Sequence, residues 1–430
     1  MLMCNNKNYK KIICCLLFMG AAFFVCAQPK LFFKDAIKAK RDTFYNRTVR
    51  SINRTFLLPL DSNTAEAWQS TFYNINLLNI KSKKIDAVVK KVSQKIALQN
   101  DDCKKAFLDL INNKYPKVYF TTVKNICNST NDDKLQAMCL HYLIKSKINN
   151  EEDDWIKNKF VEISTKNKTS AIIHELGVEI DFAYSKQNQP YFKSFLDSTY
   201  LPNTTIVFSF QKSDRNYPGI VMIRKADGHF LKNNDGTFFY TGQLARSLSN
   251  MPGYISNGNT PQGIFKMNGF DTSKNYFIGP TTNIQLSMPF EASRVLVNNE
   301  EVDTTWTLEQ YKNLLPKDFQ NYAPIYGSYY AGKAGRTEII AHGTTVNPTY
   351  YKEQIFFPYT PTAGCLATIE MWNEKNGSLQ KSNQYLLTQA LQKAGGAFGY
   401  LIVVDIDHNS SEIDALEKAI KFKNILPYLP

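Results

Sequence analysis

Cysteine is scarce in this sequence of 430 residues, and its placement excludes several classes of protein. Four of the eight cysteines lie within the first 27 residues, which leaves too few for a disulfide scaffold. No C-x-x-C spacing occurs, which argues against a metal or redox site, and we predict neither a metal nor a cofactor. If Cys365 is a free nucleophile, Cys103, Cys127 and Cys139 allow one disulfide, and the sequence does not say which two would pair.

The N-terminus lacks an apolar run long enough to cross a membrane. Residues 12–25 are uncharged and largely apolar, whereas a spanning helix needs about 20 residues. Lysines at positions 7, 10 and 11 precede this run, and Val25-Cys26-Ala27 follows as a cleavage signal, so residues 1–27 are predicted to be a secretory signal peptide. Lipid attachment at Cys26 is the less favoured alternative, because Val25 stands where a lipobox has a small residue. We predict an exported protein of the periplasm or cell envelope, with no transmembrane helix after cleavage.

Acidic residues are outnumbered by basic ones. The formal charge is +13, and loss of the three signal-peptide lysines leaves +10 (13 − 3) on the mature chain. A basic exported protein suits an anionic envelope, either a wall polymer or a membrane surface, and export argues against nucleic acid as a partner. A merely solvated basic surface explains the charge equally well.

Residues 28–200 are rich in lysine and asparagine and show helical periods. Apolar residues fall on one helical face over Ile85–Ile96, and again over Leu135–Leu143. His141 and His174 stand alone on such segments and are interpreted as structural or simply exposed. We predict an α-helical region of unassigned role, a candidate docking surface for an envelope protein.

From residue 201 the pattern changes to short apolar runs separated by turn signals such as Asn234-Asp235-Gly236. The predicted fold class is therefore α+β, with a β-rich domain over residues 201–410 and a C-terminal helix and tail over 411–430. Within these ranges we predict strands at Ile206–Phe210, Ile220–Ile223 and Tyr400–Val404, and helices at Leu379–Lys393 and Ser411–Lys421.

The stretch Glu338–Ala367 carries the candidate chemistry. A short apolar run ends at His342-Gly343, as expected of a buried strand that turns at a sheet edge. Further on, Cys365 follows a Pro/Thr-rich loop and precedes a segment, Leu366–Glu374, whose apolar residues recur every three, as at the start of a helix. Unpaired N–H groups at a helix start lower a thiol pKa. We predict Cys365 as nucleophile and His342 as general acid and base.

Three short motifs occur in order: Thr260-Pro261-Gln262-Gly263-Ile264-Phe265, His342-Gly343-Thr344 and Thr362-Ala363-Gly364-Cys365-Leu366. Together they resemble the signature of the L,D-transpeptidase catalytic domain (YkuD-like), over roughly Ile206–Asp405. The resemblance implies a β-sandwich-type catalytic domain. It also implies an enzyme that forms a cysteine thioester with a peptidoglycan stem tetrapeptide, releases D-alanine and passes the acyl group to an amine.

The resemblance implies roles for further residues. Backbone N–H groups at Gly364 and Cys365 would hold the oxyanion, a backbone carbonyl would orient His342, and the stretch Tyr350–Tyr359 would form a loop over the cleft. Gly343 and Thr362 are expected to contact substrate, and Thr260, Pro261, Gly263 and Phe265 would shape the cleft without taking part in the chemistry. Two further substrate contacts are candidates from the sequence itself. Arg336 would supply the positive charge that the family usually has at position 367, and Tyr330 would line a sugar or peptide groove, with packing against the Tyr350–Tyr359 stretch as the favoured alternative.

Two alternatives stay open at this stage. The same site would act as an L,D-carboxypeptidase or peptidoglycan hydrolase if water replaced the amine. A catalytically inactive wall-binding domain is the other alternative, because Ala367 stands where the family usually has arginine or asparagine.

Overall fold

The computed structural model describes residues 30–147, 149–184, 190, 193–291 and 306–406. The predicted signal peptide and the predicted helix at 411–421 lie outside these residues. Within the described part the chain has twelve α-helices and a mixed sheet of eight strands. The prediction of an α+β chain is therefore confirmed.

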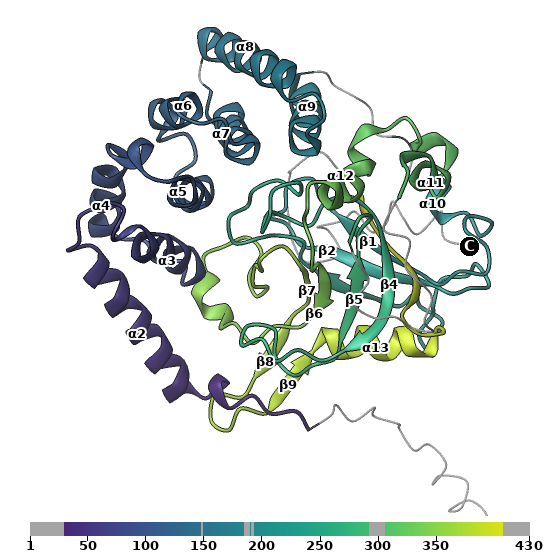
Figure 1. Cartoon of the computed structure of the whole chain (residues 1–430). Coiled ribbons are helices and arrows are strands. Elements are labelled where there is room, and N and C mark those ends of the chain that lie inside the picture. Colours follow the sequence, from purple (N-terminus) through teal and green to yellow (C-terminus); the bar gives the residue numbers. More distant parts are fainter. Residues whose placement is uncertain (1–29, 148, 185–189, 191–192, 292–305, 407–430) are drawn as a thin grey trace, which may run out of the picture.

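The first part of the described chain is helical, and its helices follow one another in an arc around one side of the sheet (Figure 1). Polar residues start several of them by accepting a hydrogen bond from the first turn, as Ser82 does from Ile85 N–H and Asp132 from Leu135 N–H. The helices of the arc are α2 (Lys38–Thr55), α3 (Ala65–Leu77), α4 (Lys83–Ser93), α5 (Asp101–Lys114), α6 (Phe120–Asn128), α7 (Asp133–Ser146), α8 (Asn150–Lys166) and α9 (Ala171–Tyr184). The short helix α10 (Lys193–Leu196) lies apart from the arc, at the right of Figure 1.

The eight-stranded sheet has the order β3-β2-β1-β10-β4-β5-β6-β7, with parallel pairing only for β1 with β10 and β6 with β7. A separate antiparallel pair is formed by β8 and β9. The strands are β1 (Ile206–Gln211), β2 (Gly219–Arg224), β3 (Tyr240–Gln243), β4 (Gly263–Asp271), β5 (Asn283–Ser287), β6 (Ile340–His342), β7 (Leu366–Ala367), β8 (Glu370–Trp372), β9 (Leu379–Ser382) and β10 (Phe398–Asp405). Helices α11 (Leu308–Asn313), α12 (Gly327–Lys333) and α13 (Asn383–Lys393) lie between them in sequence.

The large sheet curls until its two edges meet. Leu244, directly after β3, and Ala367 of β7 exchange two backbone hydrogen bonds of 2.8 and 2.9 Å. One curled sheet, rather than two separate sheets, thus encloses a hydrophobic core that includes Phe265, Leu401 and Val403. Helix α13 contributes Leu387 and Leu391 to the same core.

The outer face of the sheet has its own core, and this explains the uninterrupted apolar runs of its strands. Every residue of β1 and of β2 is buried. Alternate residues point into the inner core and into an outer cluster that contains Phe208 and Phe210 together with Tyr311 of α11 and Tyr329 of α12.

Two sequence predictions in this region are wrong. The segment after Cys365 does not begin a helix, because Leu366–Ala367 pair with β6 and Glu370–Trp372 pair with β9. The predicted helix at 379–393 begins only at Asn383, where Ser382 accepts a hydrogen bond from Tyr385 N–H and ends the strand β9. In both segments the spacing of apolar residues suits either structure, and pairing with a distant strand decides the outcome.

The helical arc is attached to the β-rich part through the stretch that follows the His342 strand. The Tyr351 hydroxyl donates to the Leu77 carbonyl at 2.7 Å, and the Asn79 amide donates to the Tyr350 carbonyl at 2.9 Å. This stretch was predicted to form a loop over the cleft. Instead, it docks on the helices, because its aromatic residues are buried there with Leu77.

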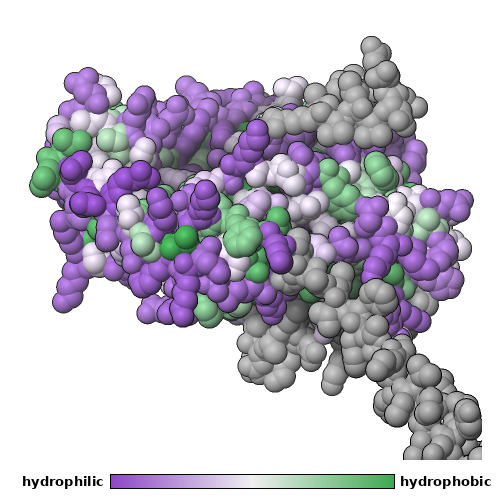
Figure 2. Space-filling view, turned by 90° about the horizontal axis from the view of Figure 1, so that it is seen from below, coloured by the Kyte–Doolittle hydropathy of each residue, from purple (hydrophilic) through white to green (hydrophobic). Residues whose placement is uncertain are grey.

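The face of the molecule shown in Figure 2 is mainly polar where its residues are described. On the face shown in Figure 2, hydrophobic residues form small groups among hydrophilic ones. None of the described helices is both long and apolar enough to cross a membrane. Cys103, Cys127, Cys139 and Cys365 are all free thiols, and no cluster of potential metal ligands occurs among the described residues.

Candidate active site

Cys365 and His342 are brought together by the parallel pairing of β6 with β7. Ala341 pairs with Leu366 and His342 with Ala367, so Cys365 precedes β7 while His342 ends β6. Residues two apart on a strand share a face, which places both side chains on the same side of this pair. Pairing geometry sets their Cα atoms about 7 Å apart along the strands and about 5 Å apart across them. The described contacts of the two side chains go elsewhere, because the thiol bonds to the Glu338 carbonyl and His342 Nδ1 to the Gly343 carbonyl.

Thr362 fixes the turn that carries Cys365. Its hydroxyl accepts a hydrogen bond from Gly364 N–H at 2.9 Å and donates to the Cys365 carbonyl at 2.8 Å. Gly364 has a φ of +114°, and a Cβ there would collide with Arg336 and the Gly258 carbonyl. Only glycine fits. Since its N–H is already bonded to Thr362, Gly364 does not supply the expected oxyanion donor, and the N–H of Cys365 remains for that role.

Distant motifs meet at the Gly364 carbonyl. It accepts hydrogen bonds from the Thr260 hydroxyl at 2.9 Å and from Arg336 Nη2 at 3.2 Å. The other members of the first motif are packing residues: Pro261 contacts Gly253, Gly263 has no room for a Cβ beside Ser328 and Tyr311, and Phe265 is in the inner core. The first motif therefore braces the cysteine turn.

Arg336 and Tyr330, both predicted to contact substrate, have structural contacts instead. Arg336 is buried, and besides Gly364 it donates to the carbonyls of Gly253, Gly258 and Asn259. Burial lowers its pKa to about 10, and the nearby Cys365 partly offsets this. Tyr330 stacks on His174 with 3.9 Å between ring centroids. Arg336 is thus a structural clamp, and Tyr330 joins α12 to the helical region.

His342 is held as a neutral imidazole. Its Nδ1 hydrogen bonds to the Gly343 carbonyl, which can only accept, so Nδ1 carries the proton and Nε2 is free to act as a base. Burial lowers the pKa of His342 to about 4, and the bond to Gly343 opposes this only in part. The imidazole is therefore unprotonated throughout the neutral range.

Glu370, which sequence analysis did not single out, lies beneath the His342-Gly343 turn. Its carboxyl accepts from Thr344 N–H at 3.0 Å and from the Ser382 hydroxyl at 2.6 Å, and burial raises its pKa to about 7. A Cβ on Gly343 would overlap this carboxyl. Gly343 is therefore required by Glu370, rather than by a substrate contact, and no motif around Glu370 signals this in the sequence.

The thiol of Cys365 is also neutral. It donates to the Glu338 carbonyl at 3.4 Å. Burial raises its pKa above the ordinary value, although the Ile340 N–H and the charge of Arg336 oppose this. The predicted lowering of the pKa is wrong, because no helix begins at this residue. The resting pair is a thiol and a neutral imidazole, not an ion pair.

Cys365 opens onto a cleft of about 310 Å³. Among the residues predicted for the site, Cys365 is the one that lines this cleft. The other lining residues include polar ones such as Asn268, Gln285 and Glu338. Glu338 has a φ of +66°, rare for a residue with a side chain, and its N–H donates to Glu291 at 2.7 Å. This backbone conformation aims the Glu338 carbonyl at the thiol.

Ala367 is buried, with 1 % of its surface exposed, where the sheet closes. An arginine or asparagine at this position would have to displace packed neighbours. Any substrate contact that the family makes from this position is therefore not made by Ala367.

Alkylation of Cys365 should report the neutral state of the thiol. Because the thiolate is the reactive species, we expect iodoacetamide to react more slowly at pH 7 than with a free cysteine. The rate should rise about tenfold per pH unit and still be rising at pH 9, as followed by intact mass. Cys365→Ala is the control, since Cys103, Cys127 and Cys139 are fully buried. A plateau reached by pH 7 would contradict a neutral thiol.

No family model matches the chain, and neither a curated protein nor a solved structure shows significant similarity to it.

Proposed function

We propose that the protein is an exported, cysteine-dependent L,D-transpeptidase that acts on peptidoglycan stem peptides. The observation that carries the proposal is the pairing of β6 with β7, which sets the Cys365 turn beside a histidine whose Nε2 is free to accept a proton. The resemblance of the three motifs gives the substrate class. The first and third motifs touch where the Thr260 hydroxyl donates to the Gly364 carbonyl, a contact that their order in the sequence alone does not require.

In the proposed reaction, His342 Nε2 removes the thiol proton while Cys365 Sγ attacks the carbonyl carbon of the third stem residue, whose bond to D-alanine is the one that breaks. The oxyanion is stabilised by the Cys365 N–H. The imidazolium then protonates the leaving amine, so D-alanine departs and a thioester remains. In the second half, Nε2 takes a proton from the acceptor amine as it attacks the thioester, and the thiol is regenerated.

The cleft lining favours an amine over water as the acceptor. Asp271, Glu291 and Glu338 line it with carboxylates, against one cation, Lys274, among the described lining residues. Such a site concentrates ammonium groups near the thioester. Water remains a competing acceptor, and its product would be the tripeptide of an L,D-carboxypeptidase.

A disaccharide-tetrapeptide tests the proposal. We expect D-alanine release together with a cross-linked dimer, measured by mass spectrometry of the products. D-alanine with tripeptide alone would assign the hydrolase. Neither product from folded protein whose Cys365 still reacts with iodoacetamide would reject the enzyme and leave a wall-binding domain.

A further inference from the structure

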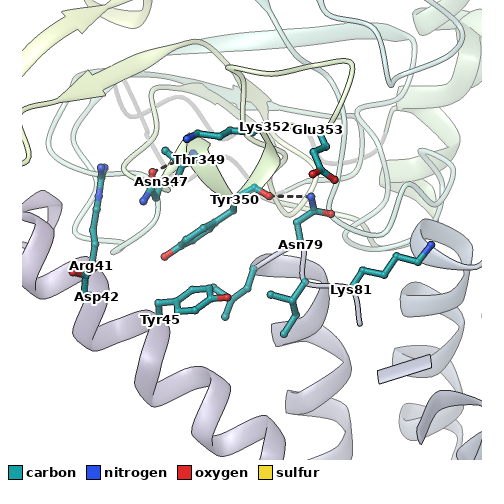
Figure 3. Close-up of a pocket in the computed structure, with 12 residues that line it drawn as sticks. Arg41, Asp42, Tyr45, Asn79, Lys81, Asn347, Thr349, Tyr350, Lys352 and Glu353 are labelled. Carbon is teal, nitrogen blue, oxygen red and sulfur yellow. Dashed lines mark hydrogen bonds between the residues drawn. The ribbon is translucent and has the colours of Figure 1, made fainter. Parts of the chain in front are cut away.

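A second cleft, of about 520 Å³, lies where the helical arc meets the β-rich part. One wall comes from α2 and from the turn after α3, with Arg41, Tyr45 and Asn79. The opposite wall is the segment Asn347–Glu353, a few residues beyond His342. Figure 3 shows the Tyr45 and Tyr350 rings in the middle of the cleft, with Arg41 on one side and Asn79 on the other. All of its lining residues are described, and none of them lines the Cys365 cleft.

The two tyrosines form an aromatic platform. Their ring centroids are 5.9 Å apart and the rings are inclined at 36°. Rings this close already touch, so a ligand cannot insert between them and would instead lie over their shared surface. The platform is fixed from both sides, because Asn79 holds the Tyr350 backbone and Arg41 donates to the Thr345 carbonyl at 3.4 Å.

Several polar groups around this platform have no partner. Within the described residues, the hydroxyls of Tyr45 and Tyr350 form no hydrogen bond, and Lys81, Lys352 and Glu353 form neither a hydrogen bond nor an ion pair. Other lining residues do have partners. Arg41 is 8 % exposed and donates to Glu374 at 3.3 Å, and Asp42 accepts from Lys38 at 2.8 Å. Asn79 bonds to Tyr350 and Lys114, and Asn347 accepts from Thr349 N–H. The cleft thus combines a preformed apolar surface with donors and acceptors that are free to bind a ligand.

We propose that this cleft binds a saccharide chain. Sugar rings present C–H groups that lie flat on aromatic rings, and their hydroxyls both donate and accept hydrogen bonds. That chemistry matches an aromatic platform bordered by amide, hydroxyl and charged groups of both signs. A polyanion fits less well, because Asp42 and Glu353 line the same cleft as Arg41, Lys81 and Lys352.

If the proposed function holds, the saccharide is the glycan strand that carries the stem peptides. The wall of the cleft that contains Tyr350 lies a few residues after His342 in the chain. Between them, Thr344 is held in place by its N–H, which donates to Glu370, and by its carbonyl, which accepts from the Trp372 indole. A glycan strand bound on the platform would keep its stem peptides close to the protein whose Cys365 is proposed to cleave them. The saccharide site itself depends only on the platform.

Calorimetric titration of the Cys365→Ala protein with N-acetylglucosamine tetramer tests the site independently of the enzyme. We expect saturable binding that weakens at least tenfold in Tyr45→Ala. Tyr45→Phe should weaken it only two- to threefold, because the ring is kept. The matched control is Phe398→Ala, which removes a 55 % exposed aromatic ring from β10 and should leave binding unchanged.

Three outcomes would overturn the proposal. One is no saturable binding by a folded protein at millimolar tetramer. Another is binding that survives Tyr45→Ala unchanged in a protein with an unaltered melting temperature, which would put the saccharide elsewhere. The third is that the N-acetylglucosamine tetramer does not bind but a stem tripeptide does, and that Tyr45→Ala weakens the binding of the tripeptide. The cleft would then be a peptide site. Because the nucleophile is absent from every sample, these results stand apart from those of the D-alanine assay.

Discussion

Cys365→Ala is expected to abolish D-alanine release from a stem tetrapeptide and to leave no mass adduct with a carbapenem. The nucleophile is lost outright, and losses of at least about a thousandfold are typical when the nucleophile of a covalent mechanism is removed. Cys365 lies in a turn held by Thr362 and Gly364 through backbone atoms of residue 365, so the alanine variant should fold normally. A melting temperature within about 1 °C of the wild type is the control.

His342→Gln should give a different pattern. Loss of the base should slow D-alanine release by about 10²–10⁴-fold. Alkylation of Cys365 at pH 10 should change little, because the thiolate then forms without help. Since the pKa of His342 is about 4, wild-type turnover should not fall as the pH is lowered from 7 to about 5. An acid limb centred near pH 6.5, or equal loss of alkylation and turnover in His342→Gln, would contradict the assigned base.

Sequence patterns predicted much of the local structure. The apolar runs at Ile206–Phe210 and Ile220–Ile223 are strands. The helical face predicted over Leu135–Leu143 is buried in α7, and the one over Ile85–Ile96 is buried in α4 as far as Val92, with Ile96 in the 3-10 turn that follows. The helical faces recur over several turns, so their period identifies helices, whereas the strands are short apolar runs that their flanking turn signals identify. The short segments around Cys365 were misjudged, because two-residue and three-residue strands are defined by their partners and not by their own pattern.

The candidate pair could be found from sequence, but its surroundings could not. His342 and Cys365 stand in short motifs with glycine beside each. Glu370 and Glu338 have no such motif, and they reach the site only because β8 and the turn before β6 are folded against it. The same holds for closure of the sheet at Leu244 and Ala367, which joins residues 123 positions apart (367 − 244). Contacts of this range are set by tertiary packing.

Arg336→Met should be the most destabilising of the substitutions considered. The guanidinium is 4 % exposed and bonds to four carbonyls, those of Gly253, Gly258, Asn259 and Gly364. Methionine fills much of the volume of the arginine side chain but cannot donate a hydrogen bond, so the four carbonyls lose this donor. We expect the free energy of unfolding, measured by denaturant titration, to fall by about 3–5 kcal/mol.

Lys333→Met is the matched control for this prediction. Lys333 is exposed at the end of α12, three residues away, and the same change there should cost less than about 0.5 kcal/mol. Arg336→Lys should lie between the two, since an ammonium keeps the charge but cannot span four carbonyls on different segments. Equal stabilities of Arg336→Met and Lys333→Met would contradict the clamp. Gly364 would then be held by Thr260 and Thr362, so the first motif and the Thr362 hydroxyl would position Cys365 without Arg336.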